Sequence, residues 1–187
     1  DSGYEEYALD LIKRYNRGEL SSADSIRFPE SQRFRTLELN RVVYGGGGIM
    51  PDYFVPVDTS AYTDYYRELI RRGIFNRFIL QYVDQNRDRM IGQYEDFQSF
   101  QSQYEPTGEQ LDALVSFAGE EGLEFVPSDW EVSREQVTLL FKGYLARDLY
   151  GMGYFYQVFN PSNEVFNKAV EILKNPSMHR QKLAKAD

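Results

Sequence analysis

Hydrophobic and polar positions divide the chain into two parts that meet near Thr59. Beyond this point, apolar residues recur at the three- and four-residue spacing that places them on one face of an α-helix. This spacing predicts helices over 60–73, 74–89, 95–104, 107–121 and 133–151, a short helical turn over 154–159, and a last helix over 160–175. The pattern therefore predicts a helical domain over residues 59–187.

Polar residues at the helix starts refine these boundaries. Thr107 with Gln110, and Ser133 with Gln136, follow the capping-box pattern, in which a hydroxyl and an amide satisfy the first free backbone N–H groups of a helix. We therefore expect the strongest helix to begin at Ser133. Asn175-Pro176 should end the last helix, because proline does not continue a helix.

The first part of the chain has a mixed pattern. Apolar spacing predicts a helix over 3–17, and alternation predicts a hairpin of strands 34–37 and 41–44 with its turn at 38–40. Four glycines then lead into a third predicted strand, 53–57. The expected fold class is mainly α (α+β): a small N-terminal β-element over residues 1–58, followed by the helical domain.

Composition and charge limit the classes of function. The 187 residues are 42% hydrophobic and carry a formal net charge of −8. This acidity argues against nucleic acid as the main partner, since phosphate binding needs a basic face. Without cysteine, disulfides, thiolate catalysis and zinc–thiolate sites are excluded. No apolar run approaches the length of a membrane span, and the start without methionine suggests a fragment.

The acidic residues concentrate between Glu105 and Glu135. Nine carboxylates lie in this stretch, against Arg134 as the one base. A solvated acidic face and a docking surface for another part of the same protein both fit this pattern.

The glycine run, Gly45–Gly48, does not fit a nucleotide site. A phosphate loop needs Lys and Ser or Thr after its last glycine, and here Ile49 and Met50 follow. The dinucleotide fingerprint would need glycine at position 50. We therefore expect the glycines to let the backbone turn tightly or pass close to another segment.

One stretch resembles a calcium loop. Asp84, Asn86, Asp88 and Glu95 occupy ligand positions of the EF-hand pattern, but Arg89 stands where the sharp turn requires glycine. The alternative is a helix end followed by a polar loop, and the four residues remain only a weak calcium candidate. His179, the single histidine, lies in the basic tail without a partner for a metal site or a catalytic triad.

The segment around the glycine run resembles a known family. Gly46, Gly48, Ile49, Pro51 and Asp52 match the pattern Gly-x-Gly-Ile-x-Pro-Asp, and an apolar strand follows. The stretch 41–58 is similar to the segment that closes the core of the carboxyl-terminal processing (tail-specific) serine proteases, in the variant from the envelope of Bacteroidetes-type bacteria. The helical patterns at 62–73 and 133–151 are similar to the C-terminal extension of that variant.

This resemblance implies that residues 1–58 are the C-terminal end of a peptidase core. Family members use a serine nucleophile, a lysine base and a PDZ domain, all upstream of the glycine motif. The stretch 21–25 looks like the family's serine context, but the next lysine is Lys142 and no Gly-Lys-Gly follows. We therefore assign no catalytic residue, metal or cofactor, and expect the chain alone to be inactive.

The resemblance also implies partners and a location. The expected partners are the rest of the protease core, its PDZ domain and the parent's polypeptide substrates, and a homo-oligomer is left open. The expected location is the periplasm or cell envelope of a Gram-negative bacterium. The alternative is a free-standing, non-catalytic protein-binding helical module, with calcium as a ligand at 84–95.

Overall fold

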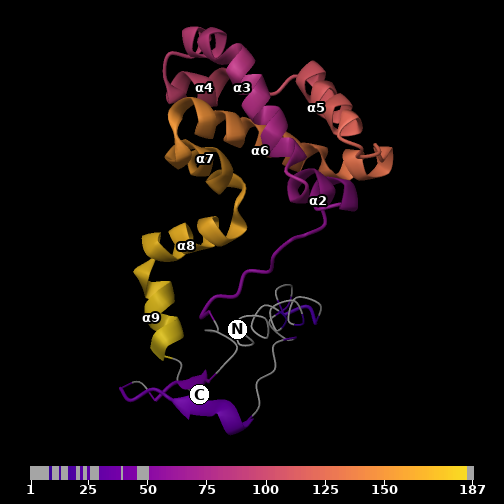
Figure 1. Ribbon diagram of the computed structural model, residues 1–187. Coiled ribbons are helices and arrows are strands. Elements are labelled where there is room, and N and C mark those ends of the chain that lie inside the picture. Colours follow the sequence, from indigo (N-terminus) through magenta and orange to yellow (C-terminus); the bar gives the residue numbers. More distant parts are fainter. Residues whose placement is uncertain are drawn as a thin grey trace, which may run out of the picture. The chain divides into compact units, whose positions relative to one another are not determined.

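A computed structural model describes residues 9, 13, 17–19, 22, 25, 30–38, 40–45 and 51–184, with the side chains of 183 and 184 left out (Figure 1). The described chain is mostly helical and has one two-stranded antiparallel sheet, which confirms the predicted fold class. Contacts divide the chain into a helical unit, Thr59–Asn163, and a second unit that combines Asp1–Asp58 with Glu164–Asp187. In the described part, no helix has the length and apolarity needed to cross a membrane.

The helical unit is built around its longest helix, α6. This helix packs against α2, α3, α4 and α7, while α5 packs against α3 (Figure 1). The elements are α2 (Asp64–Arg71), α3 (Ile74–Gln93), α4 (Phe97–Gln103), α5 (Gly108–Glu120), α6 (Pro127–Tyr150), α7 (Met152–Phe159) and the 3-10 turn η3 (Asn160–Ser162).

Aromatic side chains fill the core of this unit. Phe75, Phe100 and Phe141 are fully buried, and the Phe75 and Phe141 rings meet edge to face with centroids 6.4 Å apart. At the start of α6, Trp130 is only 7% exposed and packs against Tyr65 at a centroid distance of 6.2 Å. Apolar burial of this kind is the main source of stability in a small helical domain.

Several predicted helix boundaries in this unit are wrong. α3 continues to Gln93, and α6 begins at Pro127, six residues before Ser133. Proline is favoured in the first helical turn because its missing N–H would have no partner there. The Ser133 side chain is buried, and its hydroxyl donates to the Asp129 carbonyl (2.8 Å) inside the helix, so it is not a cap. By contrast, the predicted Thr107 capping box is confirmed.

The second unit contains the sheet. β1 (Arg33–Arg35) follows the 3-10 turn η2 (Glu30–Gln32) and pairs antiparallel with β2 (Val42–Tyr44), so that Phe34 lies opposite Val43. The predicted hairpin is therefore confirmed, although each strand is shorter than expected. The predicted helix over 3–17 lies mostly outside the described residues.

The predicted strand over 53–57 is wrong, because these residues are irregular and pair with no described strand. Pro56 has no N–H to donate to a ladder. Instead, the Tyr53 hydroxyl donates to the Met178 carbonyl (2.9 Å). The predicted last helix corresponds to η3 and α8 (Glu164–Lys174), which ends before Asn175-Pro176 as expected, whereas a further helix, α9 (Pro176–Ala184), was not predicted.

Candidate functional site

The glycine motif is only partly described. Gly46, Gly48 and Ile49 lie outside the described residues, whereas Pro51 is exposed and the Asp52 carboxylate forms an ion pair with the Arg41 guanidinium. This ion pair joins the chain on the two sides of the glycine run. Arg41 and Asp52 thus have a structural role in this arrangement.

Gly45, the first residue of the run, has a clear steric reason to be glycine. A Cβ atom there would lie 2.8 Å from the Phe34 ring, closer than real contacts allow. The Gly45 N–H donates to the Gln32 carbonyl (2.8 Å), which extends the hairpin pairing by one bond. At this position the expected close backbone approach is present.

The calcium candidates do not form a loop. Asp84, Asn86 and Asp88 lie on α3, and Glu95 follows the end of that helix. The Asn86 side-chain oxygen, which would bind calcium, accepts a hydrogen bond from the Arg89 guanidinium (2.8 Å). A straight helix cannot wrap these oxygens around one ion. Among the described residues, no group of three or more acidic, histidine or cysteine side chains could hold a metal.

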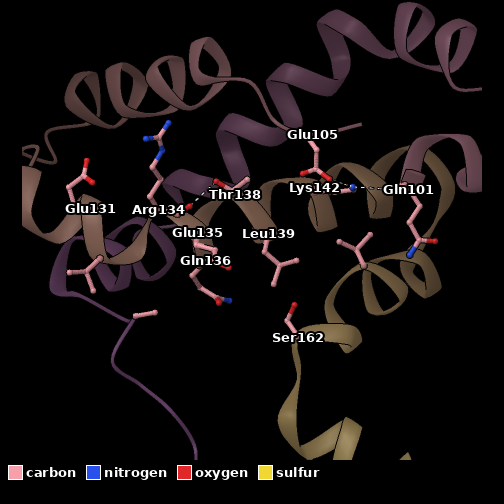
Figure 2. Close-up of a pocket in the computed structure, with 13 residues that line it drawn as sticks. Gln101, Glu105, Glu131, Arg134, Glu135, Gln136, Thr138, Leu139, Lys142 and Ser162 are labelled. Carbon is pink, nitrogen blue, oxygen red and sulfur yellow. Dashed lines mark hydrogen bonds and ion pairs between the residues drawn. The ribbon is translucent and has the colours of Figure 1, made fainter. Parts of the chain in front are cut away.

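A groove with a volume of about 730 Å³ runs along α6 in the helical unit (Figure 2). Most of its lining residues belong to α6, and the others come from α4 and the loop after it, from α7 and η3, and from Ala61 before α2. The lining residues are Ala61, Gln101, Glu105, Glu131, Val132, Arg134, Glu135, Gln136, Thr138, Leu139, Lys142, Val158 and Ser162. No sequence motif pointed to this groove.

Lys142 is the buried charge beside the groove. Its side chain is 11% exposed, and its ammonium group donates to the Gln101 carbonyl (2.9 Å) and to the Glu105 carboxylate (2.7 Å). These bonds occupy the lysine and join α6 to the chain at the end of α4. Lys142, which the sequence showed only as the first lysine after the serine-rich stretch 21–25, is therefore a structural residue.

Titration properties near the groove also favour a packing role. Burial raises the pKa of Tyr66 to about 12, and the neighbouring Tyr62 contributes, against a smaller opposite effect from Gln136. The Tyr62 and Tyr66 rings stack with centroids 5.3 Å apart. Tyr66 of α2 therefore stays protonated at neutral pH, and its side chain is hydrogen-bonded to Gln136 of α6.

Part of the helical unit matches a known protein family. Residues 65–151 match a family of unknown function (DUF8443). The matched region starts in α2 and ends just after α6, so it lies within the helical unit. No curated protein and no solved structure matches the chain.

Proposed function

We propose that the chain is the C-terminal part of a carboxyl-terminal processing serine protease. In this proposal, residues 1–58 complete the peptidase core, and residues 59–187 are a non-catalytic domain that braces the core or forms an interface. The parent enzyme would cleave polypeptides in the periplasm or cell envelope. The residue pattern of the glycine motif, in the stretch 41–58, is the basis for choosing this family.

The observation that carries the proposal is the uncovered hairpin. The side chains of Phe34 and Val43, which face each other across the strands, are 56% and 42% exposed, and Leu37 in the turn is fully exposed. An isolated two-stranded hairpin is only marginally stable in water. Within the described residues the two strands pair only with each other, and exposed apolar side chains of this kind are expected of a hairpin that adds to a larger sheet, which the rest of a peptidase core would supply.

The helical unit supports a non-catalytic role for the second domain. Its one buried lysine, Lys142, already has two bonded partners. Its groove is lined by both charged or amide side chains and apolar ones, which is a surface suited to holding another chain. The serine and lysine of the reaction would thus come from the upstream part of the parent.

The competing function is a free-standing protein-binding module. The family match favours this reading, since it is confined to the helical unit and does not reach the stretch 41–58. The calcium version of this alternative receives no support from α3, where the candidate ligands lie on a helix.

The coding sequence upstream of residue 1 distinguishes the two functions. The protease proposal expects a PDZ-like segment, a serine in a Ser-Ala-Ser/Ala-Glu context, and a lysine in a Gly-Lys-Gly context about two dozen residues later. An upstream sequence without this pair would overturn it.

An activity assay is the second test. The substrate is a folded protein with an unstructured C-terminal tail, incubated with the parent and with this chain alone. We expect cleavage by the parent only. Cleavage by the chain alone would contradict the proposed division of roles, and an inactive parent would contradict the family assignment.

A further inference from the structure

Helix α6 is apolar on two opposite sides. One side faces the core, where Val137, Phe141 and Leu145 are completely buried. On the other side, Val132 is 55% exposed and Leu139 is half-buried. A helix with apolar residues on both sides is normally covered on both, so this second side is a candidate binding surface.

Helix α7 covers only part of the second side. At Gly143, α7 approaches so closely that a Cβ atom would lie 3.1 Å from the Phe155 ring. Towards the start of α6 this cover ends, and the groove begins. Figure 2 shows Leu139 and Gln136 projecting from α6 into the space towards Ser162. Val132 and Leu139, seven residues apart, lie on the same side of the helix, at the spacing that a second helix can contact.

The charges of the groove favour a basic occupant. Lys142 is neutralised by Glu105. Glu131 and Glu135 form no ion pair with any described residue. The remaining base that lines the groove is Arg134, which in Figure 2 projects from α6 on the same side as Glu131 and away from Leu139. Two carboxylates without an ion pair against one base leave the groove lining with a net negative charge, within the stretch of nine acids that surrounds it in the sequence.

We propose that this groove binds an amphipathic helix of a partner polypeptide, with an apolar stripe flanked by lysine or arginine. The stripe would cover Val132 and Leu139, and the bases would lie near Glu131 and Glu135. Helix-in-groove binding of this kind takes its affinity from buried apolar anchors and its selectivity from charge. The proposal concerns the helical unit alone and stands whether or not the chain belongs to a protease.

Three labelled synthetic peptides of equal length test the occupant's chemistry by fluorescence anisotropy with the full chain. The first has a leucine stripe flanked by lysine, the second has the same stripe flanked by glutamate, and the third replaces the leucines of the first with serine. We expect the first to bind at least about tenfold more tightly than the others, because only it offers both apolar and charge complementarity.

Two pairs of variants test the position of the site. Glu131→Lys with Glu135→Lys should weaken binding of the lysine–leucine peptide at least about tenfold. The same change at Glu109 and Asp112, exposed on α5 and outside the groove, should leave it within about twofold. Val132→Asp should weaken binding similarly, and Leu80→Asp, a comparably exposed residue on α3, should not.

Circular dichroism of each variant checks that the fold is retained. The proposal is overturned if the serine peptide binds as well as the leucine peptide, since binding would then be charge alone. Equal losses in the groove and control variants would also overturn it, as would an absence of binding to the unmodified chain.

Discussion

At the scale of single residues, Tyr65 contains an unusual buried group. Its hydroxyl oxygen is the one buried side-chain polar atom without a hydrogen-bond partner in the described part of the chain. The ring itself is well packed, edge-on to Phe125 and Trp130. Burial also raises the pKa of Tyr65 above its usual value. The ring therefore stabilises the core, while the hydroxyl opposes folding.

Removal of this hydroxyl should stabilise the helical unit. An unsatisfied buried polar group costs about 1–3 kcal/mol, and phenylalanine keeps the ring without that group. We expect Tyr65→Phe to raise the free energy of unfolding by up to about 1 kcal/mol in urea titration. A loss of stability would mean that the hydroxyl has a partner after all. Tyr65→Leu, which removes the ring contacts as well, serves as the destabilised control.

The two predicted capping boxes should respond differently to alanine. Thr107 accepts from the Gln110 N–H at the true start of α5, so Thr107→Ala should cost about 1 kcal/mol. The Ser133 hydroxyl donates inside α6 to a carbonyl four residues back, so Ser133→Ala should change stability by less than about 0.5 kcal/mol. Thermal unfolding of both variants tests the pair, and equal losses would contradict the assigned helix starts.

The same two residues show how far local sequence patterns predict this fold. Both fit the capping-box pattern equally well, but Thr107 follows a polar loop, whereas Trp130 lies three residues before Ser133 and is held in the core. Burial of Trp130 favours a start of α6 before Ser133. The stabilisation comes from packing against Tyr65, which is distant in sequence. A pattern confined to neighbouring residues does not contain this information.

At the scale of elements, the contact between α6 and α7 depends on Gly143. Leucine there would overlap the Phe155 ring, which also contacts the Tyr144 and Phe159 rings. We expect Gly143→Leu to lower the free energy of unfolding by about 2 kcal/mol. Gly119→Ala is the matched control, because no atom lies within 4 Å of its added methyl group and helix propensity should favour it by up to about 1 kcal/mol.

Chemical denaturation compares these variants. Full stability of Gly143→Leu would contradict the close packing of the two helices. In Gly143→Leu, the lower free energy of unfolding should be accompanied by weaker protection of amide hydrogens from exchange in α7 than in α3, because α7 packs chiefly against α6.

Secondary-structure elements were predictable where the apolar pattern extends over many residues. They were less predictable where contacts with residues distant in sequence determine the local structure. Most helices after residue 60 were predicted from their apolar spacing, although α6 begins before Ser133 and α9 was not predicted. The segment 53–57 reads as a strand by composition, yet Tyr53 bonds to the Met178 carbonyl and the Lys182 ammonium lies over its ring. The groove was unpredictable for a related reason: it combines Ala61, Gln101 and Ser162 with α6, and these residues share no local pattern.

At the scale of the whole molecule, the core and the sheet belong to different units. The buried apolar core cluster lies between Tyr65 and Val158, entirely inside the helical unit. The described hairpin residues contribute none of it, and every residue of β1 is exposed. Stability of the two units should therefore differ greatly.

A polypeptide of residues 59–163 should fold by itself. It keeps the whole core cluster, so we expect cooperative thermal unfolding by circular dichroism and a melting temperature within about 5 °C of the full chain. In the full chain, hydrogen exchange should show strong amide protection in α3 and α6 and weak protection in β1 and β2. A non-cooperative melt of the shorter polypeptide would show that its core needs the other unit.

The burial of Trp130 has an optical consequence. It is the chain's single tryptophan, shielded by Tyr65 and Phe125 in the first turn of α6. Its fluorescence should therefore be blue-shifted and should report on the helical unit alone. Because Glu131 and Val132 of the groove follow it directly, a bound helix should alter this emission, whereas pairing of the hairpin with other strands should not. One label-free signal could thus distinguish the two associations proposed for this chain.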